Sequence, residues 1–448
     1  MIYVNKKLLN YLPCVIILLL FGMFQVSRIN ADYNKLLSSS GLITEDYRKK
    51  IDLENNRARQ NEKEYQEILI KEGEEDQIKS NPSSEQNNKK SSGYQKLKLH
   101  SRGAVLLDAS NNRVLYEENG YKELPMASTT KIMTCIVALE NSKPNEVVTI
   151  SKHASSMPDV QLNAKPGEKF YLGDLLYSLM LESHNDIAVA IAEHVGGSVE
   201  GFATMMNDKA RKLGCEHTNF VTPNGLDAPG HHTSARDLAV IASYAIKNKE
   251  FIKITNAPTH EFYEIKNKKK YFVSNKDRFL YMMEGAIGVK TGFTNGAGYC
   301  FVGAVQKPDR TLVSAVLGCG WPPSKNLKWN DTKELMNYGV KNYSLKQIFQ
   351  DKKLQPLIVK DGQQRYEPLT MKGDISLLLR DDEQVRVEYD LPKGLVAPIK
   401  SSVEIGKAKY YVNDVLYKEI PIYATKDIKK IDLIYCLKKI VSYWSGRF

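Results

Sequence analysis

Ser128 and Lys131 are the residues of this chain whose types and spacing most directly suggest chemistry. If they open a helix, they share one face with Cβ atoms about 5–6 Å apart, so the lysine amine stands beside the serine hydroxyl. A serine hydroxyl is a poor nucleophile without a neighbouring base. A lysine serves as that base when burial or nearby cations lower its pKa. The pair therefore predicts a nucleophile, Ser128, and its base, Lys131, with backbone N–H groups at the helix start directed toward developing negative charge.

Two further motifs follow in the chain, Ser183-His184-Asn185 and Lys290-Thr291-Gly292. A hydroxyl both donates and accepts a proton, so we expect Ser183 to relay the proton to the leaving amine. We expect Asn185 to bond the substrate amide and to hold the lysine base. Each motif alone arises by chance, but the three in this order predict a single acyl-transfer site.

The third motif predicts how the substrate is held. Lys290, at the expected end of a strand, adds positive charge that favours a neutral lysine base and attracts a substrate carboxylate. Thr291 is expected to hydrogen-bond that carboxylate. Gly292 lets the substrate backbone pair along the strand edge. The N–H groups of Ser128 and Phe293 are expected to form the oxyanion hole.

The elements that must position these motifs follow an α+β pattern. Strands at 103–108 and 113–116 precede the helix that carries Ser128. Helical spacing of apolar residues continues, and strands return before the segment ends. The further helices are expected over 171–194, 199–213 and 233–248, and the further strands over 286–290, 298–306 and 311–317. Strands at both ends with helices between them predict one mixed sheet flanked by helices.

The remaining segments predict tethering and export. Residues 1–30 have the basic start and apolar run of a signal peptide, and the run also fits an uncleaved signal anchor. Residues 31–97 are polar and indicate a tether, leaving 98–343 as the catalytic domain. Short strand-like runs over 344–427 predict a small all-β domain. Residues 428–448 have apolar side chains at helical spacing and lysines mostly off that face, which favours a helix lying in the membrane interface over one docked on the protein body.

The composition limits the partners. The chain has 448 residues and a formal net charge of +11, which favours anionic partners such as a membrane surface, cell-wall polymer or nucleic acid and does not choose among them. It contains no P-loop, dinucleotide glycine motif or zinc-type Cys/His spacing. We expect no cofactor, no metal and no nucleic-acid partner. The six cysteines form no close pairs and are expected to be buried thiols.

With these motifs in place, the chain from about 98 to 343 resembles the serine D-Ala-D-Ala carboxypeptidases, the low-molecular-mass penicillin-binding proteins of peptidase family S11. The segments 224–227 and 233–239 support the resemblance. It implies a β-lactamase/transpeptidase-like catalytic domain followed by a small all-β domain. It also implies removal of the terminal D-alanine from peptidoglycan stem peptides at the outer face of the cytoplasmic membrane, and acylation of Ser128 by β-lactam antibiotics.

Three alternatives use the same fold. A class A β-lactamase needs a deacylating Glu-x-x-Leu-Asn setting, which Glu216-His217-Thr218-Asn219 does not match. A D,D-transpeptidase would pass the acyl group to an amine instead of water. A silent sensor of wall fragments or antibiotics would not need Ser128, Lys131 and Ser183 together.

Four other residues carry expectations. His184 is expected to line the cleft as a spectator. His231 and His232, which precede a helix, are expected on a surface loop. Lys328 stands where some family members carry an arginine near the substrate carboxylate.

Overall fold

The structure, a computed structural model, describes residues 96–349 and 354–444, with side chains to residue 442. The predicted signal segment, nearly all of the tether, and Phe448 in the expected apolar face of the tail lie outside the described residues. Within the described residues, no helix has the length and apolar character needed to cross a membrane.

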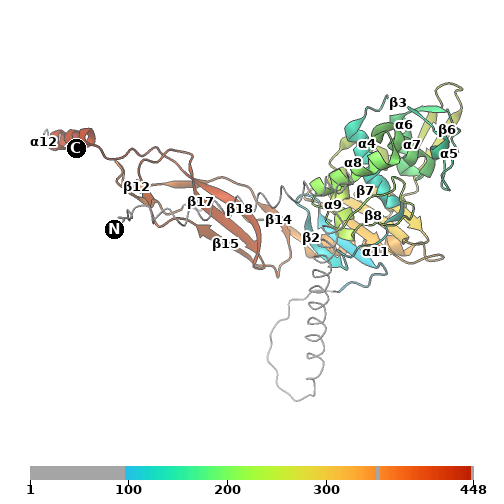
Figure 1. The fold of residues 1–448 in the computed structure, drawn as a ribbon. Coiled ribbons are helices and arrows are strands. Elements are labelled where there is room, and N and C mark those ends of the chain that lie inside the picture. The colour runs from blue at the N-terminus through green and yellow to red at the C-terminus, as the bar shows by residue number, and fades with distance from the viewer. Residues whose placement is uncertain (1–95, 350–353, 445–448) are drawn as a thin grey trace, which may run out of the picture. The chain divides into compact units, whose positions relative to one another are not determined.

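A five-stranded sheet forms the centre of the catalytic region (Figure 1). Its strands, in spatial order, are β2 (Arg113–Glu118), β1 (Gly103–Asp108), β9 (Arg310–Leu317), β8 (Gly298–Lys307) and β7 (Ala286–Thr294). The first strands of the region thus pair with the last, as predicted. All four pairings are antiparallel, so the expected mixed strand direction is wrong. Tight turns account for three of them, because they join β1 to β2, β7 to β8 and β8 to β9.

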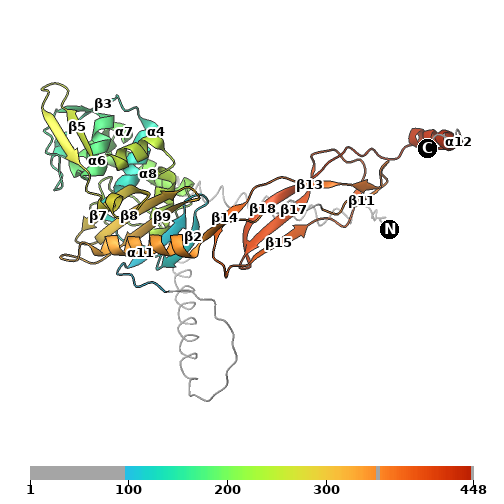
Figure 2. The same cartoon turned by 180° about the vertical axis from the view of Figure 1, so that it is seen from behind.

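Strand alternation places a different core on each face of the sheet. Val105 and Leu107 of β1 join the larger core, whereas Leu106 joins the smaller one. Helices α4 (Lys131–Asn141) and α9 (Ala235–Ala245) pack into the larger core, and α11 (Leu327–Asn342) covers the other face. Figure 2 shows α11 along the strands from the opposite side.

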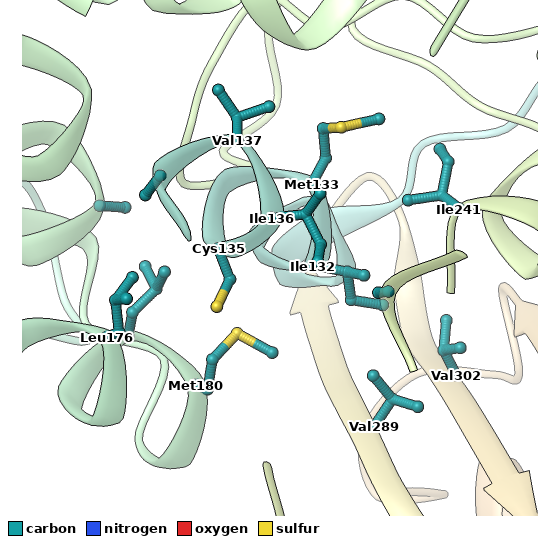
Figure 3. Close-up of a cluster of buried hydrophobic side chains, with 14 of the residues drawn as sticks. Ile132, Met133, Cys135, Ile136, Val137, Leu176, Met180, Ile241, Val289 and Val302 are labelled. Carbon is teal, nitrogen blue, oxygen red and sulfur yellow. The ribbon is translucent and has the colours of Figure 1, made fainter. Parts of the chain in front are cut away.

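Helix α4 lies in the middle of the larger core. Its side chains point outward around the helix, toward neighbouring helices on one side and Val289 and Val302 of the sheet on the other (Figure 3). Residues 131–138 are all buried. A helix that is buried all round belongs to the centre of a fold. Lys131 therefore begins this helix in an environment that disfavours charge.

The predicted helix over 171–194 is two helices, so that prediction is wrong. Helix α6 (Leu172–Leu181) ends before the second motif, and α7 (Asn185–Gly196) begins at its last residue. Between them Ser183 has φ 70°, a left-handed conformation that a continuing helix does not allow. The break therefore falls at the motif itself.

The other expected elements are present with small shifts. Helices α8 (Val199–Lys212) and α9 confirm two predictions. Strand β7 runs through Lys290 to Thr294, so the expectation that Lys290 ends a strand is wrong. The elements that the sequence did not predict here are η1 (Ala127–Thr130), β3 (Val147–Thr149), α5 (Lys152–Ser155), β4 (Lys169–Tyr171), α10 (Lys249–Asn256), β5 (Thr259–Tyr263), β6 (Lys270–Ser274) and η2 (Arg278–Tyr281).

The region after α11 is built from strands, as predicted. They are β10 (Ser344–Gln347), β11 (Leu357–Lys360), β12 (Tyr366–Glu367), β13 (Leu369–Met371), β14 (Ser376–Leu379), β15 (Val385–Asp390), β16 (Leu395–Val396), β17 (Glu404–Val412) and β18 (Val415–Ala424). Its largest sheet has the order β13-β18-β17-β15 and encloses its own small core. Helix α12 (Leu433–Trp444) follows.

The described cysteines divide into two kinds. Cys135, Cys215, Cys300 and Cys319 are buried, and burial raises the pKa of each thiol. Cys436, on α12, is exposed. The expectation of buried thiols is thus confirmed for the first four and wrong for Cys436, because the helix that carries it leaves that side chain in solvent.

Candidate active site

Ser128 lies in a tight turn that leads into α4. The turn is the 3-10 segment η1 (Ala127–Thr130), and the α-helix itself begins at Lys131. Side chains of the turn bond back to its backbone: Thr130 Oγ1 donates to the carbonyl oxygen of Ala127 at 2.8 Å. Ala127 has φ 48°, so the residue before the serine is left-handed. The serine is therefore presented by a fixed, strained turn where the sequence predicted the first turn of an α-helix.

Lys131 is fully buried beside the serine. Its Nζ lies 2.9 Å from Ser128 Oγ, 2.9 Å from Asn185 Oδ1 and 2.6 Å from the carbonyl oxygen of Asn224. Burial, and next the charge of Lys290, hold the pKa of Lys131 well below its usual value, and the charge of nearby Asp186 opposes them. The amine therefore has both the position and the depressed pKa that a base for Ser128 requires.

Ser183 lies in a turn whose neighbouring residues are held in place. Its hydroxyl is buried without a hydrogen-bond partner among the described residues. The adjacent His184 contacts Ser178 Oγ through Nδ1 at 2.7 Å and lies 3.3 Å from Glu182 through Nε2. His184 is buried away from the cavity, so the expectation that it lines the cleft is wrong. It anchors the turn that presents Ser183.

Asn185 contacts protein groups on both sides of its amide. Its Nδ2 donates to the carbonyl oxygens of Pro158 and Asp159 at 3.0 and 3.1 Å, and its Oδ1 faces Lys131. The structure thus brings Asn185 to the lysine, as expected. Its bond to a substrate amide stays a prediction.

Lys290 lies in the middle of β7 and is also buried. Its Nζ donates to the carbonyl oxygen of Thr291 at 3.2 Å. Burial lowers the pKa of Lys290 to about 8, against the raising effect of Asp277. Gly292 packs tightly on the turn that carries Ser128, since an added Cβ would lie 3.0 Å from the backbone nitrogen of Ser128. The glycine therefore brings β7 against the serine.

These motifs surround a cavity of about 590 Å³. Its lining is Ser128, Asp159, Val160, Leu181, Glu182, Ser183, Asn275, Lys276, Arg278, Thr291, Gly292, Phe293, Tyr299, Lys325, Asn326, Lys328 and Trp329. Five of the eight predicted site residues belong to it, whereas Lys131, Asn185 and Lys290 are buried beside it. The lining is rich in cations, which suits an anionic substrate group.

Lys328 lies in this lining, but its ammonium is already engaged. Its Nζ sits 4.6 Å from the ring centre of Tyr299 and 4.8 Å from that of Trp329. It also donates to the carbonyl oxygen of Lys325 at 3.1 Å. Aromatic faces attract such a cation, so the lysine is held in place beside the cavity.

Sequence reasoning missed a loop, residues 221–231, that supports the site from behind. Its Asn224 supplies the carbonyl that faces Lys131, and Asp227 accepts from Thr294 Oγ1 at 2.8 Å, beyond the end of the third motif. His231 is buried, so its expected place on a surface loop is wrong; His232 is partly buried. No residue type signals that a backbone carbonyl will face a lysine, and segment 224–227 stood out only through the family resemblance.

Comparison with known proteins identifies both regions. A family model described as D-alanyl-D-alanine carboxypeptidase matches residues 88–320, more than half of the chain. A second, described as the C-terminal domain of penicillin-binding protein 5, matches residues 343–430.

Individual relatives agree. The D-alanyl-D-alanine carboxypeptidase DacF of Bacillus subtilis is 31% identical over 354 residues, covering 77% of this chain and 90% of the relative. DacC of Escherichia coli is 28% identical over 353 residues, covering 74% and 85%. The structure of penicillin-binding protein 5 from Haemophilus influenzae matches with a TM-score of 0.63 and 27% identity, over 75% of this chain and all of that one. A Streptomyces K15 DD-transpeptidase mutant matches with a TM-score of 0.52 and 30% identity, over 55% of this chain and 99% of that one.

The α+β region therefore has the transpeptidase-like fold predicted for it, and the all-β region follows it as in penicillin-binding protein 5. The chain belongs to peptidase family S11 and is a serine-type D-alanyl-D-alanine carboxypeptidase of the penicillin-binding protein 5 type.

Proposed function

We propose that Ser128 carries out the carboxypeptidase reaction through an acyl-enzyme. Its Oγ attacks the carbonyl carbon between the two D-alanines while its proton passes to Lys131 Nζ. The N–H groups of Ser128 and Phe293 hold the oxyanion. The C–N bond then breaks, and the proton returns through the Ser183 hydroxyl to the departing D-alanine amine. The observation that carries the proposal is the buried Lys131 amine, 2.9 Å from Ser128 Oγ.

A second half-reaction frees the enzyme. Water attacks the ester of Ser128, and Lys131 takes the proton of the water and returns one to the serine oxygen. Until the D-alanine leaves in the first step, Lys290 and Thr291 hold its terminal carboxylate. The buried charge of Lys290 supports this role, because an ammonium with one backbone acceptor among the described residues can still bind an anion.

The direct test is D-alanine release from a Lys-D-Ala-D-Ala peptide by the full chain. We expect release by the wild-type protein and none by Ser128→Ala. Ser156→Ala, an exposed serine outside the site, is the matched control and should keep full activity. Mass spectrometry after incubation with a penicillin should place the adduct on Ser128. Release by Ser128→Ala would remove this serine as the nucleophile.

Transpeptidation is a second candidate reaction, because a DD-transpeptidase is among the similar structures. The same acyl-enzyme would then pass to an amine. Product analysis with and without a D-amino acid acceptor separates the two reactions. Hydrolysis product alone supports the carboxypeptidase, and joined product in excess over hydrolysis supports the transpeptidase.

We also propose that α12 attaches the protein to the outer face of the cytoplasmic membrane. Its apolar side chains are exposed: Leu433 by 75%, Ile434 by 64%, Leu437 by 53%, Ile440 by 55% and Val441 by 65%. This exposure disfavours the alternative in which the helix docks on the protein body. A short helix with an exposed apolar face and nearby lysines binds anionic lipid surfaces.

Hydrogen exchange on the full chain tests this attachment locally, independent of any anchor at the N-terminus. Vesicles with anionic phospholipid should slow exchange across residues 433–442. Ile434→Glu with Leu437→Glu should abolish that protection. Leu416→Glu, at an exposed apolar position in the all-β region, is the matched control and should leave it intact. Unchanged exchange in the wild-type protein would refute the attachment.

A further inference from the structure

His231 is buried behind the nucleophile turn, and backbone groups define its protonation. The N–H of Val221 donates to His231 Nδ1 at 3.0 Å, and the N–H of Thr222 points to the same atom at 3.4 Å. A ring nitrogen that accepts from an N–H carries no proton itself. Burial also lowers the pKa of His231 to about 4, against the raising effect of Asp227. The ring is therefore neutral, with its proton on Nε2.

The other end of the ring requires the same tautomer. His231 Nε2 lies 2.9 Å from Thr130 Oγ1. The single hydroxyl hydrogen of Thr130 is donated to the carbonyl oxygen of Ala127 at 2.8 Å. Because that hydrogen is used, Thr130 Oγ1 accepts from the histidine. The direction of every bond is thus fixed, from the backbone of Val221 through the ring and the hydroxyl to Ala127.

Ala127, where this chain of bonds ends, is held in an unfavourable conformation immediately before Ser128. Its φ is 48°, and such a left-handed alanine costs about 1–2 kcal/mol unless its surroundings hold it. Gly225 packs against it so closely that an added Cβ would lie 2.0 Å from the Ala127 carbonyl oxygen. The Ala127 carbonyl therefore accepts a hydrogen bond from Thr130 and packs against Gly225 of the 221–231 loop.

We propose that His231 is a positioning residue for acylation: through Thr130 it fixes the Ala127 carbonyl, and with it the direction of the Ser128 hydroxyl toward Lys131. The same loop supplies the Asn224 carbonyl that contacts Lys131 Nζ, so one segment aligns both partners of the proton transfer. This inference rests on the proposed role of Ser128 as nucleophile. It predicts that His231 acts on the rate of acylation and has little effect on substrate binding.

Three substitutions, two at His231 and one at Thr130, separate positioning from simple packing. His231→Asn keeps an oxygen near the place of Nδ1 for the Val221 N–H but cannot reach Thr130. His231→Gln carries its amide N–H₂ to the place of Nε2 and restores the bond to Thr130 Oγ1. Thr130→Val keeps the shape of the side chain and removes the hydroxyl. His232→Asn, at the partly buried neighbour that lies 3.6 Å from Glu123, is the matched control.

The measurements are kcat and KM for D-alanine release and the rate of acylation by a penicillin, with the full chain. We expect His231→Asn to lower kcat and the acylation rate about 10- to 100-fold, since a small misplacement of reacting groups has effects of that order. KM should change little. His231→Gln should recover most of the lost rate. Thr130→Val should lose as much as His231→Asn, and the double variant no more than either alone.

A wild-type acylation rate in His231→Asn would overturn the inference, and so would a His231→Gln variant as slow as His231→Asn or losses that simply add. Circular dichroism and thermal unfolding report whether each variant is folded, and Thr130→Val repeats the test without altering the loop. Activity of Ser128→Ala would instead refute the proposed nucleophile. The two failures are therefore distinguishable.

Discussion

The two serines of the site sit in opposite environments. Ser128 and Lys131, its proposed base, lie among bonded groups: the amine faces three oxygens, and the turn bonds back on itself. Ser183 faces the same cavity, yet its buried hydroxyl has no partner in the described parts of the chain. Each serine lies at or next to a left-handed position of the backbone: Ala127, which precedes Ser128, is left-handed, and Ser183 is itself left-handed. Backbone strain alone therefore does not distinguish the two serines.

This difference in hydrogen bonding separates groups that the protein aligns before the substrate binds from a group whose hydrogen bonds form when the substrate binds. A nucleophile and its base gain from being aligned before the substrate arrives. In its proposed role as proton relay, Ser183 must accept from one group and donate to another, and the second group is the leaving amine. An unbonded buried hydroxyl costs about 1–3 kcal/mol, which substrate binding can recover. We interpret Ser183 as a part of the site whose hydroxyl gains a protein-independent partner when the substrate binds.

We expect the largest effect on activity from a substitution in the aligned pair Ser128 and Lys131. Lys131→Arg keeps a cation but cannot release its proton at neutral pH, so kcat/KM should fall about 10²- to 10⁴-fold, the usual contribution of a general base. Acylation by a penicillin, followed by mass spectrometry, measures the step directly. Lys152→Arg, on the surface, should be unaffected. Rapid acylation of Lys131→Arg would show that another group is the base.

Substitution of Ser183 should change activity and stability in opposite directions. Ser183→Gly should lower kcat about 100-fold or more, because the relay is lost. The free energy of unfolding should nevertheless rise by about 1 kcal/mol, since glycine accepts φ 70° without strain and the lost hydroxyl had no partner within residues 96–349 and 354–444. Ser183→Ala, which keeps the strain, is the control. Urea unfolding alongside D-alanine release checks both, and a destabilised Ser183→Gly would contradict the interpretation.

The pH dependence should show the charge of Lys290. Its pKa of about 8 lies below the usual lysine value, so the ammonium is present at pH 7 and is lost as the pH rises above 8. KM for a peptide with a free carboxylate should therefore rise about tenfold for each pH unit above 8. Lys290→Arg stays charged, so the pH above which KM begins to rise, here called the alkaline limit, should move to a higher value. If the alkaline limit were the same in Lys290→Arg, the titrating group would be another residue.

The smallest effect should come from Asp277, whose charge raises the pKa of Lys290. Burial raises the pKa of Asp277 itself to about 7, so the carboxylate is mainly ionised at the pH where Lys290 titrates. Asp277→Asn removes that charge, and the alkaline limit should shift to lower pH by less than about one unit. A pH series of KM values for the two proteins measures the shift. A shift to higher pH would contradict the sign.

Local sequence patterns predicted the strands of the five-stranded sheet and several helices, and they named residues that the structure brings together, but not how those residues are held. Helical spacing ran through 171–194 without a break, because nothing in those residue types requires Ser183 to be left-handed; packing imposes it. The Asn224 carbonyl is a backbone group and leaves no mark in the sequence. His231 was misplaced because it precedes a helix, where surface loops are common, while its burial depends on partners about 100 residues earlier.

The exposed thiol of Cys436 turns α12 into a reporter. Maleimides react with accessible thiolates, and burial with raised pKa keeps Cys135, Cys215, Cys300 and Cys319 out of that reaction in the folded protein. Among the described residues, a polarity-sensitive dye would therefore attach at the C-terminal helix. A blue shift of its emission on addition of vesicles would then follow membrane contact in real time, in the same cuvette in which D-alanine release is measured.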